Sequence, residues 1–123
     1  MDHHDEEFLR RAAAARARIK EIAPQQVDTH LQSGAVAIDV REPDEYEKGS
    51  LPEARNVALD SISQQIEGVV PDKDAPMVCF CNGGNRGALA AAQLLELGYT
   101  NVQSIAGGLR GYEASQHTSD QSD

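Results

Sequence analysis

The sequence predicts an α/β domain with an open, parallel-type sheet that is flanked by helices on both faces and preceded by an N-terminal helical extension. Short apolar segments recur along the chain, as expected of strands buried on both faces of a sheet. Segments of helical character lie between them and have proline, serine or glycine at their ends. At 123 residues, the chain has the size of one domain.

The N-terminal segment, residues 1–18, is expected to be helical from about Asp5. Acidic residues open this segment, arginines follow and alanines lie between them, which suits the helix dipole. Its apolar residues are few beyond Phe8, Leu9 and Ala12, so we expect it on the surface or against a partner chain. A membrane-surface helix is the alternative, which the acidic start disfavours because anionic lipid repels it.

The main domain is predicted to span residues 19–114, where strands and helices alternate as in a parallel βα sheet. Strands are expected at 19–22, 36–40, 55–58, 77–80 and 102–105. Helices are expected at 24–32, 43–48, 61–67 and 86–97, each with a start or stop signal. Residues 115–123 are polar without an apolar anchor, and we expect them to form a flexible tail.

The charge and hydropathy of the chain limit its partners. Eleven basic and twenty acidic residues give a formal net charge of −9, the wrong sign for a phosphate backbone, so no nucleic-acid partner is expected. No segment approaches the roughly 20 apolar residues that cross a bilayer, so no membrane partner is expected. The acidic N-terminus is unlike a secretory leader, and a cytoplasmic location is the default expectation.

The two cysteines, Cys79 and Cys81, are one residue apart, so a bridge between them would close almost no loop and a secreted disulfide scaffold is excluded. No histidine lies at ligand spacing from them, and we expect neither a metal nor a cofactor. Cys79 is either a small apolar filler of its strand or a resolving thiol for Cys81. Alternate residues of a strand lie roughly 7 Å apart, which favours the filler.

The most informative segment follows the predicted strand 77–80 and opens the helix from residue 86. It reads Cys81-Asn82-Gly83-Gly84-Asn85-Arg86. Ligands of open α/β sheets bind at the carboxyl ends of the strands, which is where this segment is expected. Two adjacent glycines let backbone N–H groups turn inward as a nest for a negative charge, and the helix adds its positive end.

This nest, with the cation of Arg86 beside it, favours the thiolate form of Cys81. A thiolate attacks without a separate general base, and a persulfide on the same cysteine would be stabilised by the same donors. The alternative for Cys81 is a buried, inert thiol, which is common for free cysteines in α/β cores. Two glycines and an arginine after the cysteine favour the reactive interpretation.

Over residues 19–114 the chain resembles the single-domain rhodanese family. The matching segments, in order, are Asp39 to Pro43, Glu45-Tyr46, Gly49 to Pro52, Ala54 to Val57, Cys81 to Arg86, and Gly107-Gly108 followed by Tyr112. The sequence departs from the family pattern at three positions, where Ser50 replaces histidine, Glu53 replaces glycine and Tyr112 replaces tryptophan. These departures affect local packing and donor preference and leave the reaction class unchanged.

The resemblance implies an α/β sheet and a sulfurtransferase whose cysteine takes sulfane sulfur from a donor and passes it to a thiol or cyanide. Carried over by position, Cys81 is the persulfide-bearing nucleophile and Arg86 acts with it. The substrate-binding loop is formed by Asn82, Gly83, Gly84, Asn85 and Gly87. Asp39 and Arg41 are supporting residues of mainly structural role. The expected partners are small sulfur donors, thiol acceptors and a protein persulfide donor, with the chain a monomer or a homodimer.

Two other functions stay open. The fold also resembles the cell-cycle dual-specificity phosphatases, whose loop has one more residue between cysteine and arginine. Here four residues separate Cys81 from Arg86, which suits a single sulfur better than a phosphate and disfavours a phosphatase or an arsenate reductase. The other is a non-enzymatic sulfur-relay or partner-binding module.

The preferred sulfur donor is expected to be a persulfide or polysulfide. Asn82 and Asn85 are neutral, which leaves Arg86 as the only cation of the loop, and the net charge of −9 repels a dianion at long range. Salt screens that repulsion beyond about 8 Å. We therefore expect weak use of thiosulfate.

Overall fold

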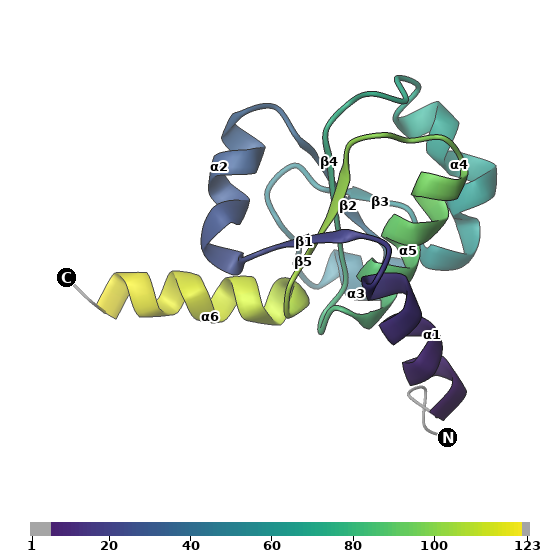
Figure 1. The fold of residues 1–123 in the computed structure, drawn as a ribbon. Coiled ribbons are helices and arrows are strands. Elements are labelled where there is room, and N and C mark those ends of the chain that lie inside the picture. The colour runs from purple at the N-terminus through teal and green to yellow at the C-terminus, as the bar shows by residue number, and fades with distance from the viewer. Residues whose placement is uncertain (1–5, 122–123) are drawn as a thin grey trace.

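A five-stranded sheet with every neighbouring pair parallel forms the centre of the molecule (Figure 1). The structure is a computed structural model that describes the backbone of residues 6–121 and the side chains of residues 6–116. The strand order is β1-β5-β4-β2-β3. The strands are β1 (Lys20–Ile22), β2 (Val36–Asp39), β3 (Arg55–Asn56), β4 (Met77–Phe80) and β5 (Val102–Ile105). The predicted open parallel sheet is therefore confirmed.

Helices cover both faces of this sheet. The helical elements are α1 (Glu6–Arg16), η1 (Pro24–Gln26), α2 (Val27–Gln32), α3 (Pro43–Glu47), η2 (Leu59–Ser61), α4 (Ile62–Val69), α5 (Asn85–Glu96) and α6 (Gly108–Gln121). In Figure 1, α2 lies on one side of the sheet, while α4 and α5 lie on the other. The mixed α/β architecture flanked by helices is thus as predicted.

The central strand β4 is buried on both faces, as its uninterrupted apolar sequence predicts. Met77 and Cys79 pack in the cluster that includes Ile66 and Leu94 of α4 and α5. Val78 and Phe80 pack in the cluster on the opposite face, which includes residues of α2 and α6. Because successive side chains of a strand point to opposite faces, this one strand joins the two halves of the core.

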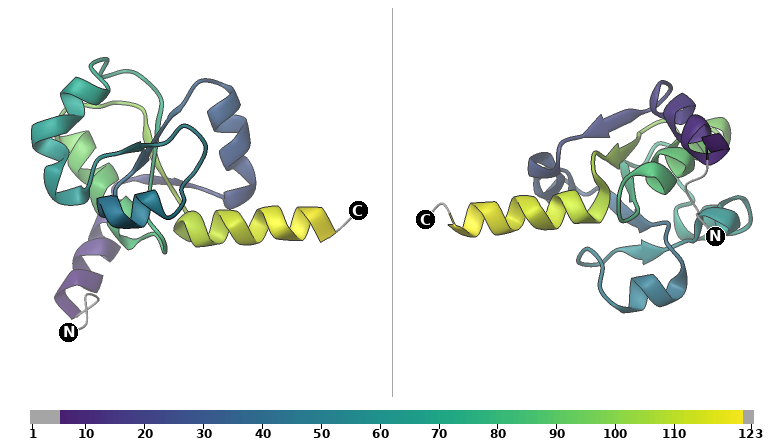
Figure 2. Two further views of the ribbon diagram at one scale, coloured as in Figure 1. Left: turned by 180° about the vertical axis from the view of Figure 1, so that it is seen from behind. Right: turned by 90° about the horizontal axis from the view of Figure 1, so that it is seen from below.

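The main difference from the prediction is α6, which begins at Gly108 in a segment where no helix was predicted. The polar residues from position 115 onward, predicted to be frayed, continue α6 as far as Gln121. Gln116 donates from Nε2 to Asp28 Oδ2 at 3.1 Å, so a polar contact with α2 takes the place of the missing apolar anchor. Figure 2 shows α6 extending away from the body of the molecule. Residues 122 and 123 lie outside the described residues.

The three departures from the family pattern are each accommodated by the structure. Ser50 donates from Oγ to Asp39 Oδ2 at 2.7 Å. Glu53 adopts a positive φ of 62°, the left-handed conformation that glycine favours. Tyr112 donates from its hydroxyl to Asp28 Oδ1 at 2.7 Å. Burial, followed by this contact, raises the pKa of Tyr112 to about 12, so the phenol remains a neutral hydrogen-bond donor.

The N-terminal helix α1 packs on α5 of the same chain. Its buried residues are Ala12 and Ala15, and Ala15 packs in one cluster with Ala88 and Ala92 of α5. Leu9, one of the residues expected to form the apolar face, is 46% exposed. Small side chains let two helices approach closely, so alanine forms this contact where a search for large apolar residues finds none. Among residues 6–121, no helix is long and apolar enough to cross a membrane.

We predict that Ala12→Leu destabilises the protein, because Ala12 is fully buried and the larger side chain has no space beneath α1. The expected loss in free energy of unfolding is about 1–3 kcal/mol. Ala13→Leu, on the exposed side of the same helix, is the matched control and should change stability by less than about 0.5 kcal/mol. Equal midpoints of the two variants in denaturant unfolding would show that α1 is not docked as described.

Candidate active site

The sulfur of Cys81 lies where the central strand meets a helix. Cys81 follows β4 directly, and α5 begins at Asn85. Gly84 adopts a φ of 112°, a conformation that residues with a side chain rarely reach, and this turns the backbone around the sulfur. The Sγ atom accepts N–H groups from Gly84 at 3.1 Å and from Gly87 at 3.3 Å. The loop therefore surrounds the sulfur with backbone donors, the arrangement expected from the paired glycines.

A cavity of about 360 Å³ lies over this loop. It is lined by Cys81, Asn82, Gly83, Asn85, Arg86 and Arg110. Cys81 is only 2% exposed, so a reactant reaches its sulfur through this cavity and not from the open surface. All the predicted loop residues except Gly84 and Gly87 line the cavity, and those two donate to the sulfur from behind it.

Cys79 packs in the same core cluster as Cys81 but has no access to the cavity over the loop. It is fully buried in the core cluster beneath α5, and it does not line the cavity over the loop. Burial raises the pKa of its thiol to about 12. A thiol that remains protonated is a poor nucleophile, so the structure agrees with a small apolar filler of β4.

Arg86 forms an ion pair that the sequence did not predict. Its Nη1 lies 2.9 Å from Glu45 Oε1 and its Nη2 lies 3.2 Å from Glu45 Oε2, which is a bidentate contact with α3. The hydrogen bond from Arg86 lowers the pKa of Glu45 to about 2. Glu45 in turn raises the pKa of Arg86, and nearby Cys81 adds to this effect. The Glu45-Tyr46 motif was visible in the sequence, but nothing in it indicated this partner.

The supporting residues Asp39 and Arg41 form a buried ion pair that reaches the loop. Arg41 Nη2 lies 2.8 Å from Asp39 Oδ2, and both side chains are almost completely buried. This hydrogen bond is the main cause that raises the pKa of Arg41. Arg41 Nη1 donates to Asn82 Oδ1 at 3.0 Å, and Asn82 Nδ2 donates to Glu45 Oε2 at 3.2 Å. A continuous polar chain therefore connects Asp39 to Arg86 across the loop.

The start of α6 is fastened to the backbone of the cysteine loop. Leu109 N–H donates to the Cys81 carbonyl at 2.7 Å, and Arg110 N–H donates to the Asn82 carbonyl at 3.0 Å. Gly108 has a φ of 64°, and a Cβ there would lie 2.5 Å from the Cys81 carbonyl oxygen. The second glycine of the Gly107-Gly108 motif is thus required for α6 to approach the loop. This contact brings Arg110 to the cavity, a position that the sequence did not reveal.

The N-terminal helix also reaches the loop. Arg16 Nη2 donates to Asn85 Oδ1 at 2.7 Å, while Arg16 Nε pairs with Glu21 Oε2 at 3.3 Å. Asn85 is the first residue of α5 and lines the cavity. Interpreting residues 1–18 as a separate extension concealed this contact, because the two residues are 69 positions apart.

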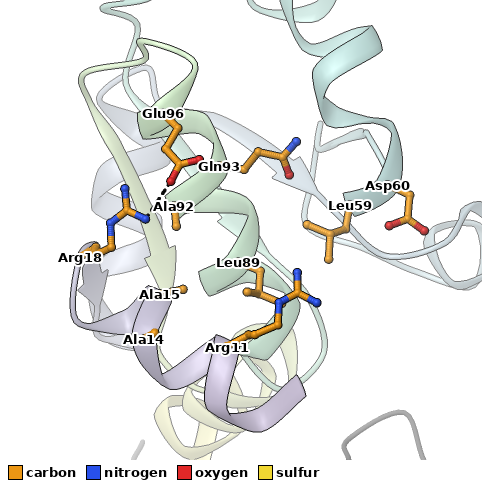
Figure 3. A pocket seen from close by; sticks show the side chains of 10 residues that line it. All are labelled: Arg11, Ala14, Ala15, Arg18, Leu59, Asp60, Leu89, Ala92, Gln93 and Glu96. Atoms are coloured by element: carbon orange, nitrogen blue, oxygen red, sulfur yellow. Dashed lines mark hydrogen bonds and ion pairs between the residues drawn. The ribbon is translucent and has the colours of Figure 1, made fainter. Parts of the chain in front are cut away.

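A groove of about 560 Å³ lies elsewhere, between α1, η2 and α5 (Figure 3). Its lining mixes small apolar residues with charged ones, and Arg18 pairs with Glu96 along it at 2.9 Å. It contains no cysteine or histidine. Within the described residues, no group of three histidine, cysteine, aspartate or glutamate side chains is placed to hold a metal ion. The candidate chemistry is therefore at the Cys81 cavity.

Residues 23–115 match the family described as the rhodanese-like domain. The chain belongs to the rhodanese family. It is 36% identical over 89 residues to the thiosulfate sulfurtransferase GlpE of Pseudomonas syringae, and the match covers 72% of this chain and 82% of that protein. The resemblance recognised in the sequence is thereby confirmed, as is the class of enzyme, a rhodanese-type sulfurtransferase.

Solved structures agree with this family assignment. A rhodanese with anions from E. coli superposes with a TM-score of 0.60 at 36% identity, covering 63% of this chain and 91% of that chain. The polysulfide-sulfur transferase homodimer of Wolinella succinogenes superposes with a TM-score of 0.74 at 25% identity, covering 89% of this rhodanese and 84% of that chain.

We predict that Gly108→Ala damages the site, because its Cβ would collide with the backbone of Cys81 and Asn82. Gly34→Ala is the matched control, since Gly34 also has a positive φ but would place its Cβ in open space. The positive φ by itself should lower the free energy of unfolding of Gly34→Ala by about 1–2 kcal/mol. Gly108→Ala should cost more and should also slow sulfur transfer by the folded protein. Equal stability losses with unchanged transfer rates would refute the close approach of α6.

We predict a pH-dependent contribution of Glu45 to stability. The pKa of Glu45 is lowered from 4.5 to about 2 in the folded protein, so its contribution is complete above pH 4.5 and is lost as the pH falls toward 2. The difference in free energy of unfolding between the wild type and Glu45→Gln should therefore shrink across this interval. Glu47→Gln, an exposed change on the same helix, controls for the lost charge. Identical pH profiles for the two variants would contradict the ion pair.

Proposed function

We propose that this rhodanese transfers sulfane sulfur through a persulfide on Cys81. The observation that carries the proposal is the Cys81 sulfur, which accepts two backbone N–H groups at 3.1 and 3.3 Å at the floor of a cavity. Fixed dipoles aimed at a sulfur stabilise its anion and need no reorganisation when the charge moves during reaction. Family membership supports the same chemistry.

In the first half-reaction, the Cys81 thiolate attacks the outer sulfur of the donor. A new S–S bond forms on Cys81, and the S–S bond of the donor breaks with its electron pair leaving on the remaining fragment. That fragment is sulfite when the donor is thiosulfate, and a thiolate or shorter polysulfide otherwise. No proton is transferred, which fits a cavity whose lining residues include no general base.

In the second half-reaction, a thiolate or cyanide attacks the outer sulfur of the persulfide. The sulfur leaves on the acceptor, and the electron pair of the broken S–S bond returns to Cys81 as the thiolate. The negative charge thus moves between two adjacent sulfurs in the same nest. The donors to the inner sulfur come from Gly84 and Gly87, while Asn82, Gly83, Asn85 and Arg86 surround the space for the outer one.

The remaining site residues hold the groups around the cavity in place. Glu45 holds the guanidinium of Arg86 with two hydrogen bonds, so the cation stays at the cavity. The buried Asp39 and Arg41 pair fixes the side chain of Asn82 through a 3.0 Å hydrogen bond. A buried ion pair contributes little net stability but holds its neighbours in one geometry. We assign Asp39 and Arg41 this supporting role.

The proposed reactants are small sulfur donors and thiol acceptors. The name of the Wolinella succinogenes neighbour states that it is a polysulfide-sulfur transferase and a homodimer. By analogy, polysulfides are candidate donors for this chain and a homodimer is a candidate assembly. The structure favours small donors over a relay module loaded by a partner protein, because Cys81 is 2% exposed and a protein donor would have to place its sulfur inside the cavity.

We predict that one additional sulfur appears on Cys81 after treatment with thiosulfate, a polysulfide or a low-molecular-weight persulfide. Intact-mass spectrometry should show a gain of one sulfur that a reductant reverses. Cys81→Ser should lose the gain. Cys79→Ala should retain it, since Cys79 is buried away from the cavity. A gain that persists in Cys81→Ser and disappears in Cys79→Ala would reverse the assignment of the two cysteines.

A further inference from the structure

We propose that Arg110, at the start of α6, binds the anionic end of the sulfur donor and so adapts the cavity to donors such as thiosulfate. This inference rests on the proposed function of Cys81. Arg110 lies outside the cysteine loop, and it lines the cavity together with Arg86 and four other residues. The donor would thus be held at two ends that belong to different elements of the fold.

The backbone of Arg110 is fixed relative to Cys81. Its N–H donates to the Asn82 carbonyl at 3.0 Å, and the preceding N–H of Leu109 donates to the Cys81 carbonyl at 2.7 Å. Gly108 leaves no gap between α6 and the loop. The guanidinium is therefore attached to a rigid support, although the side chain itself is exposed.

Arg110 differs in its charge balance from the other arginines near the loop. Arg86 is paired with Glu45 and Arg41 with Asp39, so each of these cations is neutralised by a carboxylate. Among the described side chains, none forms an ion pair or hydrogen bond with the guanidinium of Arg110. An unpaired cation beside a cavity is available to an anionic ligand, and a planar guanidinium suits an oxyanion.

The position of Arg110 also fits the direction in which a donor must lie. The sulfane sulfur has to reach Cys81 at the floor of the cavity, so the rest of the donor points toward the mouth. Gly83 places no side chain in that path, and its missing Cβ would lie 3.8 Å from Arg110 Nη1. The guanidinium of Arg110 therefore borders the cavity beside the part of the loop that carries no side chain.

This arrangement changes the expectation for donor use. Weak use of thiosulfate was expected because Arg86 was taken as the only cation near Cys81 in a chain of net charge −9. The fold adds Arg110, while Glu45 offsets Arg86. Since salt screens the distant negative charges beyond about 8 Å, the nearest unpaired cation dominates the attraction of a small anion. Thiosulfate is therefore a donor that the cavity is built to accept.

The test compares two donors in variants of the full chain. The ratio of the KM for thiosulfate to the KM for the persulfide of an uncharged thiol is measured for the wild type, Arg110→Lys, Arg110→Gln and Arg110→Glu. Cys81 takes the outer sulfur of either donor, and the remaining fragment leaves as sulfite or as the thiolate, so the two donors differ in the charge of the end that faces away from Cys81. We expect the ratio to rise about 5- to 10-fold in Arg110→Gln, since a partly exposed charge contact of this kind contributes on the order of 1 kcal/mol. It should rise further in Arg110→Glu and least in Arg110→Lys.

Arg55→Gln is the control, because Arg55 is exposed on β3 and does not line the cavity. Its ratio should equal that of the wild type. Equal ratios in Arg110→Gln and Arg55→Gln, with the persulfide donor still loading Cys81, would refute the role of Arg110 and leave the proposed function intact. Failure of every donor to add sulfur to wild-type Cys81 would refute both. The Arg110 side chain is exposed, and the hydrogen bond from its backbone N–H to Asn82 does not depend on the side chain. The variants should therefore fold, and circular dichroism checks this.

Discussion

The structure depends on one constraint: the chain must turn through a left-handed glycine directly after its central strand so that two backbone N–H groups point at one sulfur atom. Gly84 makes the turn at a φ of 112°, and its own N–H and that of Gly87 reach Cys81 Sγ. The space is so limited that a Cβ on Gly87 would lie 3.2 Å from the Cα of Phe80. The chemistry of the site and the packing of the fold therefore both require glycine at these positions. The N–H groups can point toward the sulfur only where α5 lies close against β4.

The polar chain around this turn holds the loop from the other side. Asp39 lies at the end of β2, which neighbours β4 in the sheet, and it reaches the loop through Arg41 and Asn82. Glu45 on the short helix α3 continues the chain to Arg86 on α5. Each charge in this chain has an opposite partner, which offsets the cost of its partial burial. The paired groups thus position the loop without adding net charge to the cavity.

The fold and the cysteine loop could be predicted because their signals are local. The apolar run Met77 to Phe80 indicates a buried strand, and the glycines after Cys81 indicate a nest, whatever the rest of the chain does. The contacts of Glu45, Arg110 and Arg16 could not be predicted, because each residue is 25 or more positions away in the sequence from the loop residue that it contacts. Sheet order and helix packing decide which of these distant residues come together. The helix α6 could not be predicted for a related reason, since it finds polar partners on α2 in place of an apolar anchor.

With Arg110 in the proposed role, donor preference depends on the assembled fold more than on the loop. The four arginines at or near the loop come from different segments, Arg16 from α1, Arg41 from the turn after β2, Arg86 from α5 and Arg110 from α6. Arg16, Arg41 and Arg86 each contact a carboxylate, and their charge is used to hold backbone or side chains in place. Only a cation left without such a partner can exchange water for an incoming anion at little cost. In the described part of the chain Arg110 meets that condition, so the charge that we propose to recognise the donor lies on a helix 29 residues beyond the cysteine that we propose to carry the sulfur.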